Sequence, residues 1–232
     1  MSITENVFRI RREMEQAAIA AGRDPSSIVL CAATKMNDTA AIREAIAAGV
    51  TCCGENRVQE LTQKLSENAY EGADIHFIRH LQTNKVKQVV GKVSLIHSID
   101  SLRLLEAVNK EALRQGIRQD ILLEVNIGGE ESKGGFSPDE ILPLVERFSD
   151  FPNLRLRGLM AIPPICQFPG GNNKFFQEMC NLSVDITAKK CDNVCVDTLS
   201  MGMSDDFADA VLCGSTMIRV GTAIFGARNY QK

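Results

Sequence analysis

Eight short apolar runs, rich in β-branched residues, alternate along this chain with segments whose apolar residues recur at helical spacing. The runs lie at 28–33, 50–53, 75–79, 93–97, 121–127, 155–161, 194–199 and 216–225. Strands that alternate with helices predict a parallel sheet. Eight strands also close a (β/α)8 TIM barrel, and 232 residues are near the usual size of that fold. We therefore predict an α/β fold, with one TIM-barrel domain spanning residues 1–232.

The two ends of the chain refine this prediction. Only a few residues follow the last run, so no full eighth helix is expected there. An amphipathic segment at about 4–21 precedes the first run, and we predict that it forms an extra N-terminal helix covering the gap. An open, doubly wound sheet is the alternative, but no G-x-G-x-x-G follows any run.

The bulk composition argues against several classes of partner. The formal net charge is −3 at pH 7, which gives no basic footprint for nucleic acid or an anionic membrane. The N-terminus has no apolar signal core, and no run approaches the ~18 apolar residues of a membrane span. A cytoplasmic protein is predicted.

The eight cysteines include no C-x-x-C pair, so the sequence predicts no metal site.

Polar residues follow the runs, where a barrel places its active site. Hydroxyls and glycines follow the seventh and eighth runs, where barrels often bind phosphate; the candidates are Ser200, Gly202, Ser204, Gly221 and Thr222. A helix predicted to start near Ser204 adds a positive N-terminus. Lys35 follows the first run, which lies beside the eighth in a closed barrel.

An amine beside a phosphate cup suits a molecule with an aldehyde at one end and a phosphate at the other, which is pyridoxal 5'-phosphate (PLP). Lys35 is then the Schiff-base lysine, with burial near Arg219 favouring its neutral, nucleophilic form. The alternative is a lysine that extends its ammonium from a strand end into water.

Other polar residues keep two interpretations each. Arg219, inside an apolar run, either forms a structural ion pair or points to the ring nitrogen or phosphate of the cofactor. Glu55 and Asn56 either contact a ligand or, for Asn56, cap the following helix. His80 and His97 are acid–base candidates or structural residues.

Six motifs of the chain together resemble the pyridoxal-phosphate homeostasis protein family. They are "GENRVQE", "HFIRHLQTNK", "VNIGGEESKGG", "RGLMAIPP", "LSMGMSDDFADAV" and "GSTMIRVGTAIFGAR". These proteins bind PLP in a single domain similar to the N-terminal barrel of alanine racemase. The resemblance implies a Schiff base on Lys35 and a role in intracellular PLP, vitamin B6 and amino-acid homeostasis without strong turnover. It also implies the following cofactor-binding residues: Asn56, Ser200, Met201, Arg219, Gly221 and Thr222.

The resemblance leaves specific questions open. Met36, Arg57 and Arg79 depart from the family pattern and put the rim of the pocket in doubt. Lys133, in a glycine-rich loop, is either solvated or able to contact an anion or a second cofactor. Expected partners are PLP and PLP-dependent apo-enzymes that receive it, and a monomer is expected.

Two enzymatic alternatives remain. An amino-acid racemase of similar fold uses a second domain and a tyrosine base, and the only tyrosines here are Tyr70 and Tyr230. A Schiff-base aldolase would need a carboxylate partner for Lys35, and Glu55 is the best candidate.

Overall fold

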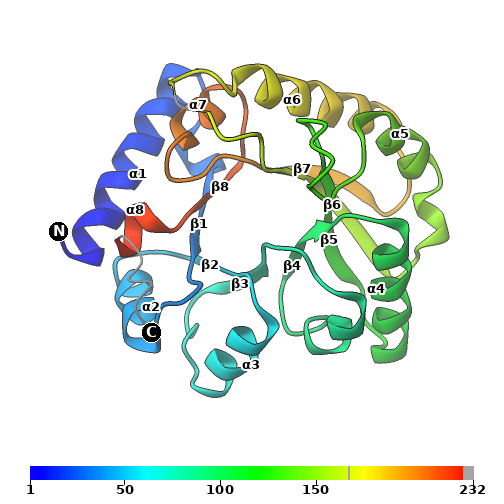
Figure 1. Cartoon of the computed structure of the whole chain (residues 1–232), viewed down its shortest axis with the longest axis horizontal. Coiled ribbons are helices and arrows are strands. Elements are labelled where there is room, and N and C mark those ends of the chain that lie inside the picture. Colours follow the sequence, from blue (N-terminus) through cyan, green and yellow to red (C-terminus); the bar gives the residue numbers. More distant parts are fainter. Residues whose placement is uncertain (167, 227–232) are drawn as a thin grey trace.

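The strands close into a single parallel barrel in chain order, with β8 paired to β1, in a computed structural model that describes residues 1–166 and 168–226. Helices surround this ring of strands (Figure 1). The strands are β1 (Val29–Ala33), β2 (Cys52–Glu55), β3 (Asp74–Phe77), β4 (Leu95–Ile99), β5 (Gln119–Val125), β6 (Leu154–Ala161), β7 (Val194–Ser200) and β8 (Met217–Val220). The predicted TIM barrel is confirmed.

The α-helices follow the alternating pattern seen in the sequence. They are α1 (Ile3–Ala20), α2 (Thr39–Ala47), α3 (Val58–Ser66), α4 (Leu102–Gln115), α5 (Pro138–Glu146), α6 (Asn173–Ala188), α7 (Phe207–Leu212) and α8 (Thr222–Phe225). Between β3 and β4 the connection is a 3-10 helix over Thr83–Gln88. None of the helices in the described part of the chain is long and apolar enough to cross a membrane.

The last predicted strand, 216–225, is wrong in its second half. β8 ends at Val220, and Thr222–Phe225 forms the short helix α8. Beyond the barrel rim the backbone bonds locally instead of to a neighbouring strand. The amide of Phe225 donates to Gly221 O at 3.0 Å, and the amide of Gly226 donates to Thr222 O at 2.9 Å.

The extra N-terminal helix is confirmed. Ser2 and Glu5 form a capping box at the start of α1, which explains where this helix begins. The helix packs against α2, α7 and α8, and Figure 1 shows it beside α8. Asn6 Nδ2 donates to Ile224 O at 2.9 Å, so α1 holds the segment that follows β8. It therefore covers the seam between the last strand and the first.

Side chains that alternate along each strand build two separate cores. Cys52 belongs to an inner cluster that fills the barrel, while its neighbour Cys53 belongs to the outer core under the helices. Members of the inner cluster come from six strands and the loop after β3. They are Cys31, Ala33, Cys52, Ile78, Leu95, Leu122, Met160 and Met217.

Candidate functional site

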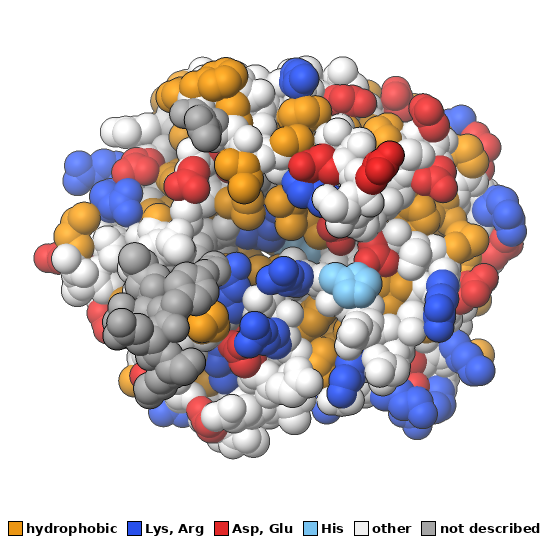
Figure 2. Space-filling view, viewed as in Figure 1, with side chains coloured by type: hydrophobic (Ala, Val, Ile, Leu, Met, Phe, Trp, Pro, Cys, Tyr) orange, Lys and Arg blue, Asp and Glu red, His pale blue; other side chains and the backbone are white. Residues whose placement is uncertain are grey.

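A pocket of about 310 Å³ opens at the carboxyl ends of the strands. Its walls come from the ends of β1, β2, β3, β6, β7 and β8. The lining residues are Ala33, Lys35, Asn56, Ile78, Arg79, Ile162, Met203, Ser204, Asp205, Arg219, Gly221 and Thr222. In Figure 2 this face is hollowed at its centre, and Lys and Arg side chains gather around the hollow. The pocket is therefore positively lined and lies where barrels carry their active sites.

Lys35 and the segment after β8 lie in this one pocket, as the pairing of β1 with β8 predicts. Ala32 pairs with Val220 in the sheet, so the next residues of both strands leave the barrel side by side. A Cβ added at Gly221 would lie 3.4 Å from the Ala33 side chain. Lys35, Gly221 and Thr222 therefore face one ligand-sized space.

Two hydroxyls form a polar corner of the pocket that Lys35 also lines. Thr222 Oγ1 donates to Ser204 Oγ at 3.0 Å, and the amide of Ala223 donates to the same oxygen at 3.4 Å. The helix predicted to begin near Ser204 begins instead at Phe207. Asp206 explains the later start, because its carboxylate accepts from the amide of Met203 at 2.7 Å and closes a turn first. Ser204 is thus a turn residue of the pocket wall.

Ser200 and Met201 lie behind this wall and not in it. Both side chains are fully buried. Ser200 Oγ accepts from Arg219 Nη1 at 2.5 Å, and Met201 packs in the outer core. Their direct contact with a cofactor stays a prediction, and of the two serines predicted for the phosphate cup, Ser204 lines the pocket.

Arg219 lines the floor of the pocket and is held by neutral partners. It is 4% exposed, donates to Ser200 Oγ, and also donates to Ala161 O at 2.9 Å. The ion pairs found between described residues include none to Arg219, which argues against the structural ion pair. Burial lowers the pKa of this guanidinium. It is thus a buried positive charge directed at a pocket.

A chain of histidines continues from Arg219 into the barrel. His97 is fully buried, with Nδ1 3.1 Å from Ser200 Oγ and Nε2 2.9 Å from His76 Nδ1. Burial lowers the pKa of His97 well below its usual value and that of His76 to about 4, so both rings are neutral at pH 7. His80 lies at the rim, 2.5 Å from Asp100. Of the described pocket lining, no residue is a histidine.

Asn56 does not cap the helix that follows it, so this interpretation is wrong. The N-cap residue of α3 is Arg57, and no side chain caps it. Asn56 instead lines the pocket, and its Oδ1 is buried with no hydrogen-bond partner among the described residues. A buried carbonyl oxygen without a donor is costly, and a bound ligand could supply the donor.

Glu55 points away from the pocket, toward α3. Its carboxylate accepts from Lys64 at 2.6 Å, from the Thr34 hydroxyl at 2.6 Å and from Tyr70 at 3.0 Å. Neither Glu55 nor Tyr70 lines the pocket. Alternation along β2 was the signal that could have shown this, because it turns Glu55 outward together with Cys53 while Asn56 lines the pocket.

The three departures from the family pattern affect the rim differently. Met36 has a left-handed backbone, φ 61°, and its amide donates to Glu60 at 2.7 Å. Arg57 is exposed and forms an ion pair with Glu60. Only Arg79 lines the pocket, where it adds a positive charge.

The strand β5 supplies an acid near the same mouth. Burial, together with the nearby Asp100, raises the pKa of Glu124 to about 7, while Arg219 opposes the shift.

Lys133 forms an ion pair with Glu130 and donates to Pro163 O at 3.2 Å. It is therefore anchored beside the end of β6 and is not simply solvated.

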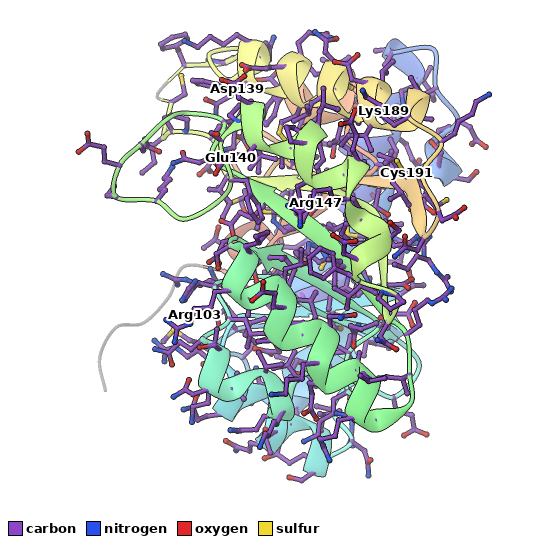
Figure 3. All side chains as sticks on the ribbon, turned by 90° about the vertical axis from the view of Figure 1, so that its right-hand side faces the viewer. Arg103, Asp139, Glu140, Arg147, Lys189 and Cys191 are labelled. Carbon is purple, nitrogen blue, oxygen red and sulfur yellow. The ribbon has the colours of Figure 1, made fainter. Side chains whose placement is uncertain are left out.

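A second cleft, of about 550 Å³, lies on the outside of the barrel between α4 and α5. Its walls include Asp139 and Glu140 of α5 and Arg147 directly after that helix, all labelled in Figure 3. No lysine contributes to the described walls of this cleft. It is larger than the mouth pocket but lacks the amine and the hydroxyl pair.

The fold and the mouth pocket together define a class: (β/α)8 barrels with a lysine at the end of the first strand, facing a polar loop after the last. Residues 3–229 match the family model described as "Alanine racemase, N-terminal domain". A pyridoxal phosphate homeostasis protein from Aquifex aeolicus is 40% identical over 99% of this chain and 100% of its own length. This chain belongs to the pyridoxal phosphate homeostasis protein family.

Two solved structures agree with this assignment. A structure described as an unknown protein from Bifidobacterium adolescentis has a TM-score of 0.88 and 36% identity, covering 96% of this chain and 94% of its own. The Synechococcus elongatus protein PipY, solved with PLP bound, has a TM-score of 0.79 and 32% identity, covering 92% of this chain and 100% of its own.

Proposed function

We propose that this protein binds PLP at the barrel mouth, with Lys35 as the Schiff-base lysine, and acts in PLP homeostasis without substantial turnover. The observation that carries the proposal is the joint presence of Lys35, Arg219 and the Ser204–Thr222 hydroxyl pair in one pocket. The PLP-bound PipY structure and the names of the relatives support it.

The residues of the pocket fit this cofactor. Asn56 Oδ1 has no donor within the described part of the chain, and Gly221 leaves the backbone accessible because it carries no side chain. When bound, PLP supplies an aldehyde and an electron-withdrawing ring. Lys35 Nζ would hold the aldehyde carbon, and the hydroxyls of Ser204 and Thr222 would bind the phosphate.

Arg219 argues for binding in preference to strong catalysis. A guanidinium facing the ring nitrogen disfavours its protonation, and an unprotonated ring is a weaker electron sink. Ser200 and Ala161 O hold Arg219 in place, so this charge is fixed before any ligand arrives. The chain's own residues therefore orient the cofactor and limit its reactivity.

Borohydride reduction of the PLP-loaded protein followed by peptide mapping tests the proposal. We expect a single adduct on Lys35 and loss of the visible absorption band in Lys35→Ala. Lys92→Ala is the matched control, because Lys92 is an exposed lysine remote from the pocket lining, and it should retain the band. Adducts scattered over several lysines would overturn the assignment of Lys35.

The racemase alternative makes a different prediction. A two-base mechanism needs a second base at the pocket, and Tyr70 is instead buried against Glu55, while Tyr230 lies outside the described residues. The aldolase alternative is weakened in the same way, since Glu55 is turned from the pocket. We expect PLP-loaded protein to racemise alanine no faster than free PLP does, and enzyme-like turnover would refute the homeostasis role.

We further propose that PLP-dependent apo-enzymes receive the cofactor and that the protein is a monomer in the cytoplasm. Light scattering of the purified protein should give the mass of one 25.4 kDa chain. Transfer is expected as a gain of activity when the loaded protein is mixed with an apo-enzyme, and a dimer mass or absence of transfer would contradict these points.

A further inference from the structure

Two thiols and an imidazole meet inside the barrel, below the mouth pocket. Cys31 on β1, Cys52 on β2 and His76 on β3 place their ligand atoms within 4.8 Å of one another, and all three side chains are buried. Cys31 and Cys52 are direct partners in the pairing of β1 with β2. Three neighbouring strands thus direct one potential metal ligand each into the same volume.

We propose that this cluster binds one Zn²⁺ ion, with His97 of β4 as the fourth ligand. The distance from Cys52 Sγ to His76 Nδ1 is 3.4 Å. A tetrahedral zinc with sulfur at about 2.3 Å and nitrogen at about 2.0 Å separates two such ligands by about 3.5 Å. The observed spacing therefore suits two ligands of one zinc ion.

His97 lies outside the three atoms that are mutually within 4.8 Å, so its ring must shift toward the thiols to become the fourth ligand. Its Nε2 lies 2.9 Å from His76 Nδ1, and its Nδ1 lies 3.1 Å from Ser200 Oγ. On metal binding, the hydrogen bond between the two rings is replaced by two metal–nitrogen bonds. The proton of His97 then resides on Nδ1 and donates to Ser200 Oγ, an outer contact that orients the ring as in known zinc sites.

Charge balance favours zinc over cuprous copper. Binding releases the two thiol protons, so Zn²⁺ with two thiolates and two neutral imidazoles carries no net charge. The same ligands around Cu⁺ would leave one negative charge, and a net charge is costly to bury. Soft thiolate ligands also disfavour magnesium and calcium.

The backbone of β2 leaves space for the cluster. A Cβ added at Gly54 would approach Cys31 Sγ to 2.9 Å, so the glycine provides room for that thiol. Buried cysteines more often act as small apolar side chains. Cys53 fits that description, since it is fully buried in the outer core and is not among the clustered ligands.

Cobalt substitution provides the test on the full-length, reduced protein. One Co²⁺ per chain should bind, with the thiolate charge-transfer absorption of a tetrahedral site, and Zn²⁺ should displace it. Cys52→Ala should abolish this absorption. Cys53→Ala is the matched control, because it removes a buried thiol at the next position, and it should keep the absorption. Circular dichroism and the urea denaturation midpoint report whether each variant is folded.

X-ray absorption of the zinc-loaded wild type tests the ligand set without any substitution. Two sulfur and two nitrogen neighbours are expected. Oxygen-only coordination, binding well below one ion per chain, or equal loss of cobalt absorption in folded Cys52→Ala and Cys53→Ala would each overturn the proposal. None of these results depends on whether Lys35 binds PLP, so the two proposals can fail separately.

Discussion

At the residue scale, Lys64 shows how one side chain supports the end of β1. Its ammonium is buried and donates to Glu55 at 2.6 Å and to Thr34 O at 2.9 Å, one residue before Lys35. Lys64→Met would leave the Glu55 carboxylate buried without its cation. We expect the free energy of unfolding to fall by about 3–5 kcal/mol, measured by urea denaturation.

An exposed ion pair provides the comparison for Lys64. Arg147 and Asp150 are 76% and 54% exposed in their side chains, so Arg147→Ala should cost less than about 1 kcal/mol. The double variant Glu55→Gln, Lys64→Met should recover part of the loss. Equal effects of Lys64→Met and Arg147→Ala would show that the buried pair is not structural.

Asn56 gives a second prediction at this scale. Its Oδ1, to which none of the described residues donates, should accept a hydrogen bond only when ligand is bound. We expect Asn56→Ala to weaken PLP binding roughly 3- to 10-fold, the value of one ordinary hydrogen bond, in equilibrium dialysis. Asn181→Ala on the outer helix α6 should leave the affinity unchanged. An unaltered affinity in Asn56→Ala would remove Asn56 from the site.

At the scale of elements, the contact between β6 and β7 depends on one glycine. Gly158 has φ +144°, and a Cβ there would lie 1.8 Å from Thr198 O. Gly158→Ala must separate the two strands or distort the backbone, so we expect a loss of about 3 kcal/mol or more in urea denaturation. Gly116→Ala, at the left-handed end of α4 with open space around it, should cost only about 1 kcal/mol. Similar losses would contradict this account.

Local signals in the sequence predicted the helices and strands well, but predicted their ends and the contacts between strands less well. The apolar runs located all eight strands, and the pairing of β1 with β8 brought Lys35 to Thr222 as expected. The helix α8 was missed because its apolar residues continue the pattern of β8. The association of Cys31, Cys52 and His76 was also missed, since it depends on register between strands and not on spacing along the chain.

At the scale of the whole molecule, Glu124 should influence the pH dependence of stability. Its pKa is raised to about 7 in the folded protein, so the folded state holds this proton more tightly than the unfolded chain. The protonated carboxyl therefore stabilises the folded state fully below pH 4.5, the ordinary pKa of glutamate, and this stabilisation is lost as the pH rises through 7. Glu124→Gln should match the wild type near pH 4.5 and be about 1–3 kcal/mol more stable at pH 8.

Urea denaturation at several pH values measures this difference. Glu111→Gln is the comparison, because its partner Arg114 lowers the pKa of Glu111 to about 2, the opposite direction. That variant should not gain stability as the pH rises. If the unfolding free energy of Glu124→Gln changed with pH in parallel with that of the wild type, the pKa of this carboxyl would be the same in the folded and unfolded states.

The pocket spans the junction of β1 and β8 that α1 covers, so it cannot form until β8 has been synthesised. Asn6 reaches Ile224, 218 residues later, and Lys35 meets its polar partners only across the junction of β1 and β8. A nascent chain still lacking β8 therefore has an open sheet edge and half a pocket. Chains stalled on the ribosome before residue 217 should remain protease-sensitive and unable to retain PLP. The cofactor site is thus completed only after β8 has been synthesised, although Lys35 is made together with β1.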